Sequence, residues 1–180
     1  VSVAFRQTLA SALSEDIRTL TTAEESWRRL VGLRLAADLA TENTARIVQN
    51  AIGAPEPEVG YFAMFAAETV FDTVSGASAA VTDRTLVSLL DRVGAVLGET
   101  GDPRLADAAV RAIGAAVAVP RSRSETLGTR AISVLSSSAS KLARSTDAIG
   151  ATSVDALPLV RAGLILRDYI AVNSDVPRDA

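Results

Sequence analysis

Apolar side chains recur every three or four residues along most of this chain, which is the spacing of one face of an α-helix. The pattern is clear from Phe5 to Leu20 and from Trp27 to Leu39, and it is strongest from Leu86 to Leu97. No segment alternates apolar and polar residues as a half-buried strand does. The sequence therefore predicts an all-α fold with no substantial sheet.

The periodic segments predict seven to eight helices, packed as an antiparallel bundle or a helical array. These helices cover about residues 3–20, 22–39, 58–75, 82–97, 103–119, 124–142 and 155–172. The number depends on whether Thr41 starts a new helix or the second helix continues through Ile52. No second copy of the 82–119 hairpin appears at a fixed period, so the sequence does not predict a solenoid.

Several helix ends carry residues that are typical of caps. Thr22 and Glu25 have the spacing of a capping box and are expected to open the second helix. Asp102, which is followed by proline, is expected to cap the helix that begins there. Gly98 and Gly101 are expected to adopt the left-handed conformation that ends many helices.

Glycines inside predicted helices indicate where two helices cross closely. Gly94, Gly114 and Gly163 each cost roughly 1 kcal/mol relative to alanine in a helix, so we expect each to allow a neighbouring helix to approach. The second helix is expected to bury one apolar stripe, formed by Trp27, Leu30, Val31, Leu35 and Leu39.

The chain is expected to form a single domain over residues 1–172. The clearest linker is residues 53–58, where Gly53 is followed by two prolines that favour extended backbone before them. This segment is a candidate hinge between two packed halves. The tail at 173–180 is polar and is expected to be mobile.

Composition excludes several kinds of chemistry. The chain contains no Cys and no His, so it has no disulfides, no thiolate nucleophile and no Ser/His/Asp triad. Structural zinc sites and haem with a His or Cys ligand are excluded by residue type. We expect no metal, no cofactor and no enzymatic activity.

The apolar segments are too short for a membrane span. The longest uninterrupted run covers 112–119, whereas a spanning helix needs about 20 residues. Arg6 interrupts the N-terminal segment, so no signal peptide is visible. We expect a soluble protein without membrane contact.

The aromatic residues are the first candidate site. Only seven of the 180 residues are aromatic, and four of these fall between Ala51 and Phe71. The cluster consists of Tyr61, Phe62, Met64, Phe65 and Phe71. It surrounds three sides of one predicted helix, which suits a central core helix, an interface with another subunit or an apolar ligand pocket.

A locally basic segment at 120–144 is the second candidate site. Five cations against Glu125 give it a charge of +4, in a chain whose net charge is −3. The cations are Arg121, Arg123, Arg130, Lys141 and Arg144. Arg121 and Arg123 precede a predicted helix start, where backbone N–H groups and guanidinium groups suit a phosphate. No aromatic residue interleaves, so contact with a nucleic-acid backbone is the weaker interpretation and a solvated loop the stronger one.

Other polar pairs have simpler structural interpretations. Ser137 and Lys141 are one helical turn apart, as a Ser–Lys nucleophile pair would require, but a Ser-rich helix face that packs against a neighbour, with Lys141 in water, is the much stronger interpretation. Glu68 and Asp72 share a helix face, and no further metal-ligand motif accompanies them. No phosphate-binding glycine motif is present.

These observations favour a non-enzymatic structural protein. We expect a self-assembling helical protein, such as the subunit of a homo-oligomer, a shell or coat-like assembly, or a scaffold, with a second copy or another protein as its partner. The alternative is a helical module that binds a small hydrophobic ligand near the 61–71 aromatic cluster.

Overall fold

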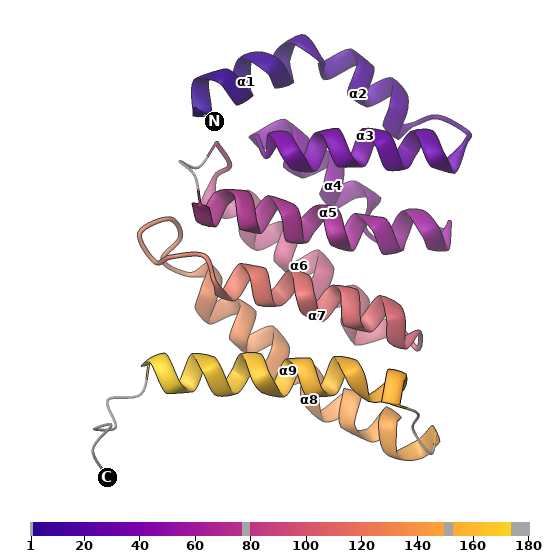
Figure 1. The fold of residues 1–180 in the computed structure, drawn as a ribbon, viewed down its shortest axis with the longest axis vertical. Coiled ribbons are helices and arrows are strands. Elements are labelled where there is room, and N and C mark those ends of the chain that lie inside the picture. The colour runs from indigo at the N-terminus through magenta and orange to yellow at the C-terminus, as the bar shows by residue number, and fades with distance from the viewer. Residues whose placement is uncertain (1, 77–79, 150–152, 174–180) are drawn as a thin grey trace.

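The structure, a computed structural model, describes residues 2–76, 80–149 and 153–173, and every regular element in these ranges is a helix (Figure 1). These helices are α1 (Val3–Ala12), α2 (Ser14–Thr21), α3 (Ser26–Leu39), α4 (Glu42–Ala51), α5 (Pro57–Gly76), α6 (Asp83–Glu99), α7 (Pro103–Val117), α8 (Leu127–Ile149) and α9 (Ser153–Asn173). Within the described ranges, β-bridge pairing is limited to one isolated bridge, between Thr41 and Ala80. The predicted all-α class is confirmed.

The described residues form nine helices, so the prediction of seven to eight is corrected. The first predicted helix breaks at Leu13, next to a hydrogen bond of 3.0 Å that Ser14 Oγ donates to Ser11 O. Serine hydroxyl groups compete with backbone N–H groups for the carbonyl groups of a helix, and this competition favours a break in the helix. The second predicted helix ends at Ala40, whose φ of 43° is left-handed, and Thr41 starts α4.

A buried arginine supports the end of α3. Arg6 is 4% exposed, and its Nη1 lies 3.4 Å from both Leu39 O and Ala40 O. The last carbonyl groups of a helix lack hydrogen-bond donors within the helix. The Arg6 guanidinium supplies a donor to the carbonyl groups at this helix end. The contact also joins α1 to the point where the chain turns from α3 into α4.

The predicted caps have mixed outcomes. Asp102 caps α7, because its Oδ1 accepts a hydrogen bond of 2.9 Å from the Arg104 N–H. The Thr22–Glu25 capping box is wrong: α3 begins only at Ser26, and Glu25 precedes it without a side-chain cap.

The predicted glycine ends are also wrong. Among the glycines of the described ranges, positive φ occurs at Gly53 alone, where φ is 82°. Gly98 and Gly101 therefore do not adopt the left-handed conformation. Helix α8 continues to Ile149, where the sequence suggested a loop. The tail expected to be mobile lies outside the described residues from position 174 onward.

The helices form two stacked layers (Figure 1). The front layer contains α3, α5, α7 and α9, and the back layer contains α4, α6 and α8. Each helix contacts the next one in its own layer and the helices before and after it in the chain. Helices α1 and α2 lie across α3 at one end of the stack (Figure 1). The arrangement is a helical array, and it matches an antiparallel bundle only roughly.

Neighbouring helices within a layer run in the same direction. Glu68 on α5 pairs with Arg111 on α7, and farther along both helices Ser75 Oγ donates to Ala118 O at 3.2 Å. Parallel neighbours arise because each front helix returns through a back helix before the next front helix begins.

A hydrogen-bonded carboxylate links α4 to α6. Glu42, the first residue of α4, accepts hydrogen bonds from the Thr82 N–H at 2.9 Å and from Thr85 Oγ1 at 2.5 Å. Thr82 is the N-cap residue of α6. The first turn of one back helix is therefore held to the first turn of the next.

The same link recurs between α6 and α8. Asp83, the first residue of α6, accepts hydrogen bonds from Ser124 Oγ and from Thr126 Oγ1, the latter at 3.1 Å. The four hydrogen bonds of the two links join residues 40, 43, 41 and 43 positions apart. The structure thus contains a repeat of about 40 residues that the sequence analysis did not detect.

Close helix crossings occur at two of the three predicted glycines. A Cβ at Gly94 would lie 2.6 Å from Val134 Cγ1, and one at Gly114 would lie 2.8 Å from Ile165 Cδ1. Gly163 has no heavy atom within 4 Å of such a Cβ, so that prediction is wrong. A third close crossing is at Gly32, where a Cβ would lie 2.7 Å from Thr21 Cγ2 and 2.9 Å from the backbone atom Thr21 N.

The contrast between Gly32 and Gly163 gives a matched test of this packing. We expect Gly32→Ala to destabilise the protein by about 1–3 kcal/mol, because the methyl group would force α2 away from α3. Gly163→Ala meets open space and removes the helix penalty of glycine, so we expect a gain of up to about 1 kcal/mol. Denaturant unfolding followed by circular dichroism measures both values. A stability change of the same sign in both variants would contradict this packing.

The Glu42 link predicts a pH dependence of stability. Desolvation alone would raise the pKa of Glu42, but hydrogen bonds from Thr82, Thr85 and Arg46 lower it from 4.5 to about 2. Because the pKa is lower in the folded state, this contribution is complete above pH 4.5 and is lost as the pH falls toward 2. We expect Glu42→Gln to cost roughly 2 kcal/mol at pH 7.

The difference between wild type and Glu42→Gln should shrink as the pH falls from 4.5 to 2, in unfolding experiments at a series of pH values. Glu24→Gln, at an exposed position, serves as the control and should change stability by less than about 0.5 kcal/mol. A wild-type advantage that persists unchanged at the lowest pH would refute the role of the ionised carboxylate.

Candidate functional site

The predicted aromatic cluster lies on α5, where it is divided between the core and the surface. Met64 and Phe71 are fully buried. Phe62 and Phe65 are half-buried, and Tyr61 is 39% exposed. An interface or ligand role for the cluster remains a prediction, and it applies to the three side chains that reach the surface.

The exposed part of the cluster is held rigidly by its neighbours. The rings of Tyr61 and Phe65 meet edge to face, with centroids 4.9 Å apart. The Arg111 guanidinium, on α7, lies 5.0 Å from the centroid of Phe65 and donates a hydrogen bond of 3.0 Å to Glu68 Oε1. Such edge-to-face and cation–π contacts are each worth about 1 kcal/mol. The aromatic surface is therefore ordered before any partner binds.

Helix α3 places a further aromatic side chain, Trp27, beside the aromatic residues of α5. Ser26 Oγ donates a hydrogen bond of 2.7 Å to Glu58 Oε1, which aligns the start of α3 with the start of α5. Next to Ser26, Trp27 is 61% exposed and has the Arg28 guanidinium 5.4 Å from its ring. One turn later, Val31 is also exposed.

The prediction that Trp27 and Val31 belong to the core is wrong. Helix α3 instead turns Leu33, Ala36 and Ala37 inward. The close approach of α2 at Gly32 and of α5 along the helix favours small side chains at the contact, while Trp27 and Val31 lie on the exposed face. The small residues 32, 36 and 37 in one helix were the sequence signal for this orientation.

We call Trp27, Val31, Tyr61, Phe65 and Arg111 the aromatic face. Its residues come from α3, α5 and α7, which are successive helices of the front layer (Figure 1). All seven aromatic residues of the chain lie in the described ranges, and Phe71 alone among them is buried. The core consists mainly of Ala, Val, Leu and Ile, and Phe62 and Phe65 pack against its edge.

A shallow pocket borders the aromatic face. It has a volume of about 430 Å³ and is lined by Phe62, Phe65, Glu68, Asp72, Arg34 and Arg111, among others. Desolvation and the nearby Glu68 carboxylate raise the pKa of Asp72, while Arg111 opposes this shift. Its charged lining suits polar contacts at an interface better than an entirely apolar ligand.

The predicted basic segment does not form one patch. All five cations are exposed: Arg121, Arg123, Arg130, Lys141 and Arg144. Arg130 Nε lies 2.9 Å from Asp91 Oδ1. The Arg130 and Lys141 side chains both line a groove between α6 and α8. Arg121 instead lines a separate cavity near α9.

The remaining candidate chemistry gains no geometric support. Ser137 Oγ donates to Val134 O at 2.8 Å, while Lys141 is exposed to solvent. Glu68 is paired with Arg111. Across residues 2–76, 80–149 and 153–173, no group of three acidic residues is arranged to hold a metal ion. Among the described helices, none is long and apolar enough to cross a membrane.

Comparisons with known proteins add no relative to this picture. Protein-family models, curated protein sequences and solved structures were each compared with the chain, and none of the three comparisons finds a match. Functional inference therefore depends on the geometry of the chain itself.

Proposed function

We propose that this protein is a non-enzymatic scaffold that binds a protein partner through the aromatic face. The observation that carries the proposal is the placement of Trp27 and Tyr61. Both are large aromatic side chains, and both lie outside a core that is mainly aliphatic.

The chemistry of this face is that of protein interfaces. Trp, Tyr and Arg are the residues enriched where truncation to alanine costs most binding energy. Here Tyr61 is held by Phe65, and Arg111 is held by Glu68 and Phe65. Ordered side chains lose little further conformational entropy on binding, which favours affinity.

The array supports a scaffolding role because it is extended. Helices stacked in parallel rows expose a continuous surface, and helical-repeat proteins use such surfaces to bind partners along their length. Three front-layer helices contribute to the aromatic face. A bound segment would therefore contact more than one helix, and its affinity would depend on the spacing between those helices.

The alternatives have less support from the same geometry. A hydrophobic-ligand site near 61–71 would have to use the shallow pocket, whose lining includes Glu68, Asp72 and Arg111. Nucleic-acid binding through the 120–144 segment would use cations that lie apart, one of them already paired with Asp91. Self-assembly remains within the proposal, as the case in which the partner is a second copy.

A peptide selection tests the proposed face directly. Peptides are selected from a random display library against the wild-type protein, and their dissociation constants are measured for Trp27→Ala, Tyr61→Ala and Arg111→Gln. We expect each substitution to weaken the selected peptides roughly tenfold or more, as truncation of central interface residues does.

Phe5→Ala is the matched control, because Phe5 is also an exposed aromatic (57%) but lies on α1, away from the aromatic face. We expect it to change affinity less than about twofold, within the range of a neutral position. No enrichment of peptides, or loss of binding in Phe5→Ala and retention in Trp27→Ala, would reject the aromatic face as the binding surface.

Absolute mass by light scattering decides whether the partner is a second copy. Self-association through the aromatic face predicts a mass above 18.7 kDa for wild type and a return to 18.7 kDa for Trp27→Ala. A wild-type monomer would assign the face to a different protein. An oligomer that is insensitive to Trp27→Ala would place self-assembly on another surface.

A further inference from the structure

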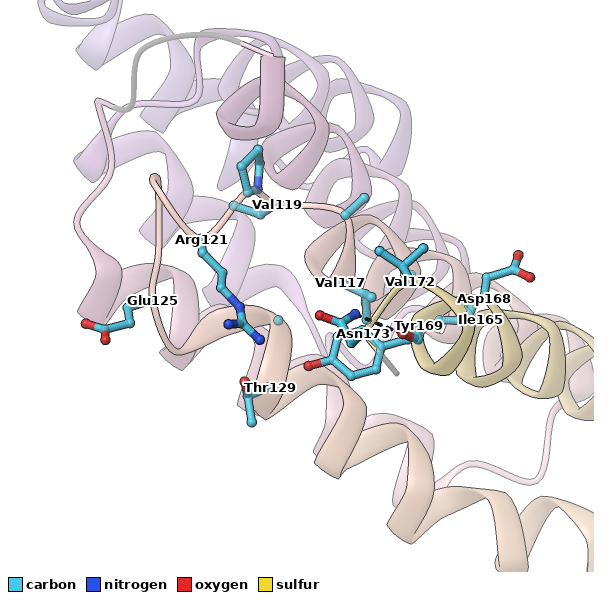
Figure 2. Close-up of a pocket in the computed structure, with 14 residues that line it drawn as sticks. Val117, Val119, Arg121, Glu125, Thr129, Ile165, Asp168, Tyr169, Val172 and Asn173 are labelled. Atoms are coloured by element: carbon cyan, nitrogen blue, oxygen red, sulfur yellow. Dashed lines mark hydrogen bonds between the residues drawn. The ribbon is translucent and has the colours of Figure 1, made fainter. Parts of the chain in front are cut away.

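A cavity of about 620 Å³ opens at one end of the stack, and none of the residues of the aromatic face lines it (Figure 2). It lies between the C-terminal ends of α7 and α9 and the N-terminal turn of α8. Its apolar wall is formed by Val117, Val119, Ile165 and Val172. This volume falls within the range of about 300–1,000 Å³ that is typical of small-molecule sites.

Two glycines help to keep this space open. Gly128 lines the cavity from α8, and a Cβ there would have only Val117 O within 4 Å, at 3.6 Å. Gly114 lines it from α7 and allows Ile165 of α9 to lie directly against the helix. The helices therefore cross closely at one edge and leave a hollow beside the crossing.

Two polar groups stand at this hollow without partners. Figure 2 shows the Arg121 side chain reaching down beside Thr129, and the Tyr169 ring across from it with its hydroxyl on the side of Arg121. Within the described part of the chain, neither the Arg121 guanidinium nor the Tyr169 hydroxyl forms a hydrogen bond or an ion pair. A guanidinium and a phenol together offer donors that suit a carboxylate or phosphate.

The anion proposal depends on the direction in which the charged side chains of the cavity point. Glu125 and Asp168 also line the cavity, but their carboxylates point away from the space between Arg121 and Tyr169 (Figure 2). Asp168 is in addition paired with Arg167, at 2.6 Å. The negative C-terminal ends of α7 and α9 and the positive N-terminal end of α8 all reach the cavity. The positive charge that faces the space between Arg121 and Tyr169 comes from the Arg121 guanidinium.

We propose that this cavity binds a small amphipathic anion. Its alkyl or acyl chain occupies the apolar space beside Ile165 and Val172, and its carboxylate or phosphate head is held by Arg121 and Tyr169. This site does not involve the aromatic face, so either proposal can fail without affecting the other.

Titration calorimetry with decanoate tests the site, using the whole protein and ligand below its micellar concentration. We expect saturable binding of one decanoate, and octanoate roughly fifteenfold weaker, because it lacks two methylenes and each buried methylene contributes roughly a fourfold change in affinity. Acetate has the head without the chain, and decyltrimethylammonium has the chain with the opposite charge. Both should bind at least tenfold more weakly than decanoate. Monodecyl phosphate in place of decanoate distinguishes the two head groups.

Variants assign the binding to named side chains. We expect Arg121→Gln to weaken decanoate tenfold or more, while the control Arg123→Gln, an exposed arginine outside the cavity, changes affinity less than twofold. Thr129→Trp fills the cavity from an exposed position and should abolish binding. The control Ser133→Trp, one turn farther along the same exposed side of α8, should not.

Circular dichroism verifies that all four variants remain folded. The proposal is overturned by the absence of saturable decanoate binding to wild type. It is equally overturned if Arg121→Gln and Arg123→Gln behave alike, or if decyltrimethylammonium binds as tightly as decanoate.

Discussion

Carboxylates at the first turn of the back helices determine how this array stacks. Glu42 receives hydrogen bonds from the N-cap and first turn of α6, and Asp83 receives them from the residues just before α8. Each link fixes both the distance and the register between two back helices, because a displacement of one residue would leave a charged group without its donors. The front helices follow, since each is joined to the back helices before and after it.

This way of stacking requires small side chains where helices cross. Gly94 and Gly114 are placed where α8 and α9 approach, and Gly32 is placed where α2 approaches. A core of this kind has little room for rings. The aromatic residues are consequently left at half-buried and exposed positions, where they are available for binding, and Phe71 is the exception.

The helical class was predictable because apolar periodicity is a local property, and so was the cap formed by Asp102. The two-layer arrangement was not, because the link from Glu42 to Thr82 joins residues 40 positions apart, and a Thr-acid pair is too short to stand out as a repeat. With the structure known, residues 41–42 and 82–83 show the same hydroxyl-acid pair at the starts of α4 and α6, and residues 124–125 show it two residues before α8 begins.

The binding surface was only partly predictable for a related reason. Tyr61 and Phe65 were found because aromatic residues cluster in the sequence, but Trp27 was assigned to the core from its apolar character. Periodicity identifies the apolar residues of a helix but does not say whether bulky or small ones face inward. In α3 the small residues do, because the neighbouring helices approach too closely for an indole ring.

A stack in which helices contact only their neighbours has no single centre on which everything depends. Damage at α9 removes the contacts of α9 with α7 and α8, and leaves the joint between α3 and α5 as it was. Small rotations at successive joints can also add up along the stack, so that the molecule flexes as a whole while each joint remains intact. The aromatic face spans two of these joints, and its shape therefore follows the bending of the array.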